Sequence, residues 1–193
     1  MANSEYICWM LTLNFHPFPD LATERLTLRK MVMDDAPELL LMRSDERVME
    51  FLDRPRLQSL EEARAFMQRV LTQEDNNEAI TWAISLKGES RMIGNICFWQ
   101  IEKENYRAEV GYMIHAEYHG MGIMTEAIRA VVHHGFRKLG FHSVQANVNP
   151  ANIASIKVLE KNGFVKEAHF RENYFFNGRF LDSAIYSLLT PLR

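Results

Sequence analysis

The sequence predicts a single α+β domain built on a mixed, twisted, seven-stranded sheet that is flanked by about four helices. Three observations lead to this fold class. A chain of 193 residues with 47% apolar residues has room for one domain with a substantial core. Its apolar residues switch along the chain between the period of a strand and that of a helix, which gives the order β-αα-βββ-α-β-α-ββ. No repeat, low-complexity tract or long linker interrupts this order.

The first half of the pattern contains a strand, two helices and a meander of three strands. Polar and apolar residues alternate in ERLTLR at 24–29, as they do in a half-buried strand. DDAP at 34–37 supplies an N-cap and an early proline for a helix to about residue 47. A Ser-x-x-Glu capping box at 59–62 begins a second helix to about residue 73. The meander strands are expected at 79–86, 92–101 and 106–115.

The second half alternates helices and strands before it ends in a hairpin. A helix is expected over 125–139 and is ended by Gly140. The remaining elements are a strand at 142–148, a helix from Asn149-Pro150 to Asn162-Gly163, and strands at 164–169 and 180–188 around an Asn177-Gly178 turn. A helix between strands 106–115 and 142–148 makes that pair parallel, whereas the meander is antiparallel. Ligands of such sheets bind where a strand ends and the next helix begins.

The composition excludes several classes of function. The chain has 22 Lys and Arg against 25 Asp and Glu, a net charge of −3, so a nucleic-acid partner is not expected. No apolar run approaches the twenty residues of a membrane span, so no membrane partner is expected either. Cys8 and Cys97 are interpreted as reduced thiols, and the histidines lack ligand spacing, so no metal is predicted.

Residues 1–22 are expected to be an N-terminal extension of a domain that covers 23–193. The apolar stretch Tyr6–Leu11 is not interpreted as a signal peptide, because no Lys or Arg precedes Arg25. A cytoplasmic protein is therefore expected. The apolar extension would pack on the domain or join two copies in a homodimer.

The loop between the strand at 106–115 and the next helix carries the strongest functional signal. Two of the nine glycines of the chain, Gly120 and Gly122, lie here. Glycine lets the backbone approach a ligand closely, and the helix N-terminus that follows attracts phosphate. Thr125 stands where a dinucleotide fingerprint needs a third glycine, and no P-loop motif occurs. The loop therefore suits another diphosphate-bearing cofactor, and a tight turn made for packing is the alternative.

Four motifs occur in order along the chain: AEVGY at 108–112, HGMGIMTEA at 119–127, NPANIAS at 149–155 and KNGF at 161–164. Together with ERLTLR and Asn177-Gly178-Arg179, they resemble the GNAT superfamily of acyl-CoA-dependent N-acetyltransferases, and within it the RimJ/RimL-like branch of ribosomal-protein N-terminal acetyltransferases. The resemblance covers residues 23–190. It implies a GNAT-like fold, acetyl-CoA as co-substrate, and direct attack by a primary amine in a ternary complex.

The branch implies a protein N-terminal amine as acceptor. The alternatives are a small-molecule amine (a polyamine, amino acid or aminoglycoside) and a non-catalytic acyl-CoA-binding regulator. The family loop usually reads Gln/Arg-x-x-Gly-x-Gly/Ala, so His119 and Met124 depart from it at its first and last positions. His119 would donate to a phosphate oxygen and Met124 would contribute its amide.

The resemblance also implies roles for individual residues. Glu109, in an otherwise apolar strand, is the candidate general base, and a surface carboxylate paired with an arginine is the alternative. Ser155 would lie near the sulfur and protonate the leaving thiolate, and Asn152 would bind the pantetheine arm. Ordinary helix capping and packing are the alternatives for this pair. The cofactor-binding set adds the Ile114 amide, for the oxyanion, and the loop residues His119, Gly120, Met121, Gly122, Ile123, Met124 and Thr125.

The acceptor would bind between residues 34–74 and the final hairpin. Tyr174 and Phe98 are the aromatic candidates for its pocket, although packing in the core is the alternative for both. A mildly negative funnel would attract a cationic amine, and scattered surface charge is its alternative. The funnel would be formed by Glu102, Glu104, Glu109 and Glu117.

Overall fold

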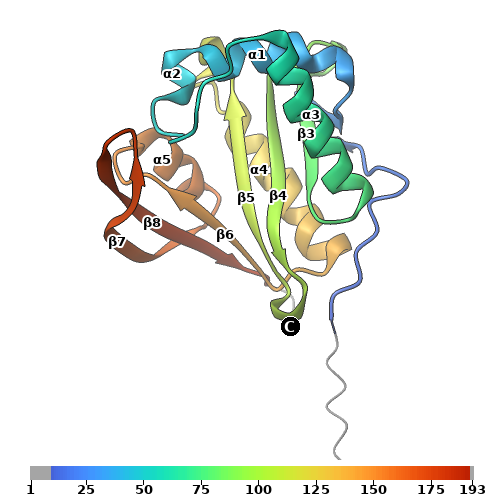
Figure 1. Cartoon of the computed structure of the whole chain (residues 1–193). Coiled ribbons are helices and arrows are strands. Elements are labelled where there is room, and N and C mark those ends of the chain that lie inside the picture. The colour runs from blue at the N-terminus through green and yellow to red at the C-terminus, as the bar shows by residue number, and fades with distance from the viewer. Residues whose placement is uncertain (1–9, 192–193) are drawn as a thin grey trace, which may run out of the picture.

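The strands form one mixed sheet in the order β1-β2-β3-β4-β5-β6-β8-β7, with helices on both faces (Figure 1). This computed structural model describes residues 10–191, so Cys8 and most of the stretch Tyr6–Leu11 lie outside the described residues. The strands are β1 Leu21–Ala22, β2 Leu26–Lys30, β3 Ile80–Leu86, β4 Gly94–Glu102, β5 Arg107–Ile114, β6 Ser143–Val148, β7 Val165–Phe176 and β8 Arg179–Leu189. The α-helices are α1 Ala36–Ser44, α2 Glu46–Met49, α3 Leu60–Asp75, α4 Ile123–His134 and α5 Ile153–Lys161.

The predicted order of elements is confirmed, but the sheet has eight strands rather than seven. The additional strand, β1, is only two residues long, and Leu21 pairs with Leu28 of β2. So short a segment cannot show an alternating pattern. The first predicted helix is divided at Asp45, whose extended backbone ends α1 and whose carboxylate accepts a hydrogen bond from the Arg47 amide at 2.8 Å, the start of α2.

Two further elements differ in length from their predictions. Strand β7 continues to Phe176, well beyond residue 169. Its pairing with β8 is irregular between Phe170 and Tyr174 and then resumes as far as Phe176. Helix α4 begins at Ile123, two residues earlier than expected, and continues into a π-helical turn over Gly135–Leu139.

Two apolar cores lie on opposite faces of the sheet. The core on the α4 face includes Trp82, Phe98 and Ile128, all completely buried. The core under α1 and α3 is rich in methionine and includes Met31, Met42, Met67 and Met92. Each core is covered by the apolar side of an amphipathic helix on its own face of the sheet.

The described part of the N-terminal extension, residues 10–22, packs on the domain. Leu13 and Phe15 are buried in the core on the α4 face. The Phe15 amide donates to Asn77 Oδ1 at 2.7 Å, and the Trp82 indole donates to the Pro19 carbonyl at 2.7 Å. This segment is therefore part of the folded domain.

Strands β5 and β6 pair over only three residues. The parallel pairs are Arg107–Ser143, Ala108–Val144 and Glu109–Gln145. Beyond them β5 remains paired with β4, and β6 remains paired with β8 as far as Val148. The two strands consequently diverge toward their carboxyl ends, as Figure 1 shows.

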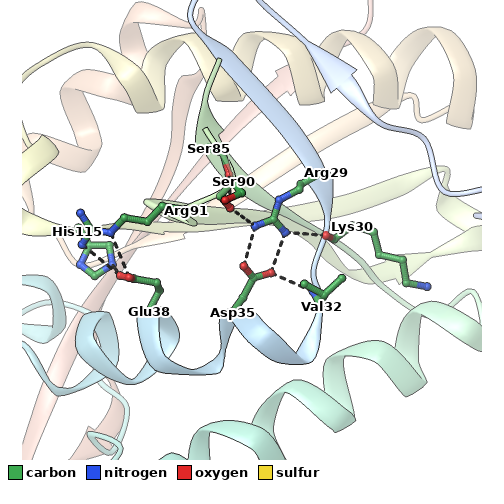
Figure 2. A network of polar contacts seen from close by, with 9 residues as sticks. All are labelled: Arg29, Lys30, Val32, Asp35, Glu38, Ser85, Ser90, Arg91 and His115. Atoms are coloured by element: carbon green, nitrogen blue, oxygen red, sulfur yellow. Dashed lines mark hydrogen bonds and ion pairs between the residues drawn. The ribbon is translucent and has the colours of Figure 1, made fainter. Parts of the chain in front are cut away.

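A polar network fixes α1 to the sheet beside the end of β5 (Figure 2). Arg29 on β2 forms two hydrogen bonds to the Asp35 carboxylate at 2.8 and 2.7 Å. Glu38 on α1 accepts from Arg91 at 3.1 and 3.2 Å, and its carboxylate lies 3.0 Å from Nε2 of His115. Burial lowers the pKa of His115, against the influence of Glu38. The network therefore fixes the position of the start of the α1–α2 segment relative to the end of β5.

The network makes a testable prediction about stability. We expect Asp35→Ala to lower the free energy of unfolding by about 3 kcal/mol, because it leaves Arg29 half-buried without its partner. Glu46→Ala is the control, because Glu46 pairs with Arg56 in an exposed position and should contribute at most about 1 kcal/mol. Urea unfolding measures both, and equal effects of the two substitutions would contradict the prediction.

Candidate active site

The predicted glycine loop forms a cradle of backbone amides at the N-terminus of α4. Gly120 and Gly122 have φ angles of +77° and +74°, which other residues rarely adopt, and Gly122 is the N-cap of α4. A side chain at Gly120 would meet no atom within 4 Å, so the outer side of the loop is open. Ile123 and Met124 point into the core, so their side chains anchor the first turn. The first-turn amides lack intrahelical partners and are suited to an anion.

Arg25, which immediately precedes β2, contacts this loop and was not predicted to be a site residue. Its guanidinium donates to the Met121 carbonyl at 3.1 Å and to Glu126 at 2.6 Å. Thr23 also donates to Glu126, at 2.6 Å. Burial opposes ionisation of Glu126, but these hydrogen bonds outweigh it and lower its pKa. Arg25 also places a positive charge beside the cradle.

His119 connects the loop to the end of β5. Its Nε2 lies 3.2 Å from the Ile114 carbonyl, which can only accept, so Nε2 carries the proton. In this arrangement the Nε2 proton is engaged by Ile114 and is not directed at a phosphate. In this structure His119 therefore acts first as a link between β5 and the cradle.

The Ile114 amide points toward the side of β5 from which β6 has separated. The next amide, that of His115, donates to the Ile93 carbonyl at 2.9 Å. Because amide directions alternate along a strand, the Ile114 N–H points away from β4. Since β6 pairs with β5 no further than Glu109, this donor has no partner strand.

Glu109 lies at the last position where β5 and β6 pair. It is 8% exposed, and Gln145 of β6 donates to it at 3.4 Å. Burial raises its pKa, although Gln145, the charge of Arg54 and Trp99 act in the opposite direction. Across residues 10–191 Glu109 forms no salt bridge, so it is not the arginine-paired surface carboxylate of the alternative. A buried carboxylate without a salt bridge is in the environment that suits a general base.

Ser155, on the first turn of α5, meets Tyr112 of β5 across the divergence of the strands. The two hydroxyl oxygens are 2.7 Å apart. Burial raises the pKa of Tyr112 to about 12, so the phenol stays protonated. Tyr112 belongs to the AEVGY motif, but no local pattern places it near Ser155, and strand alternation puts it on the face of β5 opposite Glu109.

Asn152 acts as the N-cap of α5. Its Oδ1 accepts from the Ser155 amide at 3.0 Å, which is the helix-capping alternative for this residue. Its Nδ2 hydrogens remain available as donors. The cap also fixes the first turn and thereby the position of the Ser155 hydroxyl.

The final hairpin contacts the segment between α2 and α3, in the region where the acceptor is predicted to bind. The Tyr174 hydroxyl donates to the Asp53 carboxylate in a short hydrogen bond. Burial and Asp53 both raise the pKa of Tyr174. Next to Asp53, the Arg54 guanidinium lies 5.7 Å from the centre of the Trp99 ring, and Trp99 is the β4 partner of Glu109. Tyr174 and Trp99 thus lie on either side of the segment that carries Asp53 and Arg54.

Two expectations about the acceptor site are wrong. Phe98 is completely buried in edge-to-face contact with Trp82 and Phe141, so it packs in the core and lines no accessible surface. The glutamates do not form a funnel, because Glu102 and Glu104 precede β5 and Glu117 follows it. Eight residues of strand separate the two groups by roughly 25 Å.

Within residues 10–191 no helix is long and apolar enough to cross a membrane. The same residues contain no group of three or more His, Cys, Asp or Glu side chains arranged to hold a metal ion. Cys97 is a free thiol, and burial raises its pKa to about 12.

Strands that diverge beside an amide cradle and a buried carboxylate are the features expected of an acyltransferase. The model of the acetyltransferase (GNAT) domain matches residues 25–165. The chain is 34% identical over 169 residues, 88% of this chain and 95% of the other, to the uncharacterized N-acetyltransferase p20 of Bacillus licheniformis. The chain therefore belongs to the GNAT family of acetyltransferases.

One further relative and one solved structure of the same fold are named for ribosomal substrates. The ribosomal-protein-serine acetyltransferase of Escherichia coli is 30% identical over 99 residues, 51% of this chain and 55% of that protein. The structure of RimL, the ribosomal L7/L12 alpha-N-protein acetyltransferase in complex with coenzyme A, has the same fold. Its TM-score is 0.83 at 24% identity over 91% of this chain and 100% of that chain.

Proposed function

We propose that this enzyme transfers the acetyl group of acetyl-CoA to the N-terminal amine of a protein of the ribosomal type. The observation that carries the proposal is the divergence of β5 and β6 immediately after Glu109. It leaves a carboxylate, an outward-facing amide and the Tyr112–Ser155 hydroxyl pair around one opening, with the cradle of α4 at its end.

The residues around this opening fit acetyl-CoA. The first-turn amides of Ile123, Met124 and Thr125 would hold the pyrophosphate, as helix N-termini hold phosphate. Asn152 would donate from Nδ2 to the pantetheine arm while its Oδ1 caps α5. The bound thioester supplies the acetyl group and a thiol leaving group whose ordinary pKa is about 8.5.

The remaining groups perform the transfer. The acceptor nitrogen forms a bond to the acetyl carbon, and the carbon–sulfur bond breaks. Glu109 accepts the proton that the amine releases, directly or through water. The Ile114 N–H donates to the oxygen that becomes negative. Ser155 donates its proton to the departing sulfur and takes one from Tyr112. Solvent then returns a proton to the Tyr112 phenol and receives the amine proton from Glu109.

The names of relatives support the choice of a ribosomal acceptor. Besides the two proteins described above, the alanine N-acetyltransferase of ribosomal protein uS5 from Escherichia coli is 30% identical over 104 residues. A thiol-release assay with acetyl-CoA tests the proposal against ribosomal N-terminal peptides and free amines. We expect turnover of peptides, whereas turnover confined to polyamines or aminoglycosides would contradict the acceptor. Saturable binding of acetyl-CoA without turnover of any amine would contradict transfer itself.

Glu109→Gln tests the base. Because the pKa of Glu109 is raised, kcat of the native enzyme should rise with pH as the carboxyl loses its proton, and the variant should lose this dependence. We expect kcat to fall about 100-fold or more.

The stability of Glu109→Gln is its control. A carboxyl whose pKa is raised by folding destabilises the folded state at pH values above its unfolded pKa, so the neutral variant should be at least as stable at pH 7. A slow but stable variant supports the base, and an unchanged pH profile of kcat would exclude it.

Tyr112→Phe and Ser155→Ala test the hydroxyl pair. Each should lower kcat about tenfold or more, since each removes a donor in the path to sulfur. The double variant should be little worse than Ser155→Ala alone, because the phenol acts through the serine. Multiplicative losses in steady-state kcat would show that the two hydroxyls act independently.

A further inference from the structure

Three arginines gather on the acceptor side of the sheet without any carboxylate of their own. Arg43 of α1 and Arg69 of α3 place their guanidinium carbons 4.6 and 5.6 Å from the centre of the Phe66 ring. Arg54 lies over Trp99, beside Glu109. Among residues 10–191, no Asp or Glu lies within 4.0 Å of any of the three.

Three acidic groups, Asp53, Glu46 and Glu109, have other partners. Asp53, next to Arg54 in the chain, accepts the Tyr174 hydroxyl. Glu46 pairs with Arg56 at 2.9 Å. Glu109 is bound by Gln145 and is the group proposed to receive the amine proton. The three arginines therefore form a positive cluster without a salt-bridge partner among the described residues.

Arg43 is the least satisfied member of this cluster. It is only 8% exposed, and its Nε has no hydrogen-bond partner. Its guanidinium makes one long hydrogen bond, 3.4 Å, to the Pro55 carbonyl. Burial lowers its pKa, and the charges of Arg54 and Arg69 lower it further. A buried cation held only by an aromatic ring and one long carbonyl contact is costly to the fold, and an anionic partner from outside the chain would lower that cost.

We propose that Arg43, Arg54 and Arg69 form a subsite that binds a carboxylate carried by the acceptor close to its reacting amine. This inference rests on the proposed acetyl transfer and narrows its acceptor. Glu109 takes the proton of the amine, while the guanidinium groups form charge-assisted hydrogen bonds to the carboxylate. The acceptor class is an amine with a neighbouring negative charge. The charge belongs to an acidic residue next to a protein N-terminus or to the α-carboxylate of a free amino acid.

Matched acceptors test the subsite in the whole enzyme. Peptides that begin Ser-Asp, Ser-Asn and Ser-Lys but are otherwise identical vary only the charge, and free serine against serinamide varies the α-carboxylate. We expect kcat/KM about tenfold higher for the acidic member of at least one pair, which also identifies the source of the carboxylate. Equal values within both pairs would overturn the proposal.

Variants connect this preference to the arginines. Arg54→Gln should remove the tenfold preference, measured as the ratio of kcat/KM for the Ser-Asp and Ser-Asn peptides so that the effect of the lost charge on Glu109 cancels. Arg54→Glu should make the Ser-Lys peptide the best acceptor. Arg43→Gln should also remove the preference for the acidic acceptor. If Arg43 variants fail to fold, the Arg54 variants still test the proposal, because Arg54 is exposed. Arg137→Gln is the control, because this exposed arginine lies in the turn after α4. A preference that survives both Arg54 substitutions would overturn the proposal.

A binding measurement separates this proposal from that of acetyl transfer. The acetylated Ser-Asp and Ser-Asn peptides are titrated calorimetrically into the enzyme saturated with coenzyme A. Binding of the acidic peptide about tenfold more tightly, with loss of the difference in Arg54→Gln, supports the subsite even if no acceptor turns over. Equal binding of the two peptides by the native enzyme would overturn it.

Discussion

The site depends on the brevity of the contact between β5 and β6. Parallel pairing of the two strands stops after Glu109 because each is committed to another neighbour: β5 pairs with β4 up to Ile114, and β6 pairs with β8 up to Val148. Sheet twist then carries the two pairs apart. Backbone groups that would be consumed in a continuous sheet face the opening instead. The divergence thus creates the opening and its polar lining at the same time.

Several contacts hold the two sides of this opening at a defined separation. Tyr112 and Ser155 bridge it directly, and His119 ties the cradle to the last carbonyl of β5. On the acceptor side, Asp53 and Tyr174 join the α2–α3 segment to the hairpin. The Arg29–Asp35 pair fixes the helix that leads into that segment. Each contact joins residues from different elements, so the geometry of the site is a property of the tertiary structure.

This dependence explains what the sequence could and could not predict. The element order and the glycine cradle follow from local patterns, such as apolar periodicity and two glycines before a helix, and both were predicted. The partnership of Tyr112 with Ser155, 43 positions apart, leaves no local signal, and neither does the brace that Arg25 forms with Glu126. The prediction of a glutamate funnel was wrong for the same reason. Glu102 and Glu117 are close in sequence, but strand β5 separates them in the structure. Phe98 shows that an aromatic residue on a strand does not by itself reveal which face is accessible.

The segment before the family match has a consequence for how the chain can be shortened. The matched domain begins at residue 25, but Phe15 is completely buried and its amide is held by Asn77, while Pro19 caps the indole of Trp82. The packed domain is therefore larger than the part of the chain that the family match covers. Trimming the chain to the family boundary would remove a wall of the core under α4 and expose Trp82, the largest of its fully buried side chains.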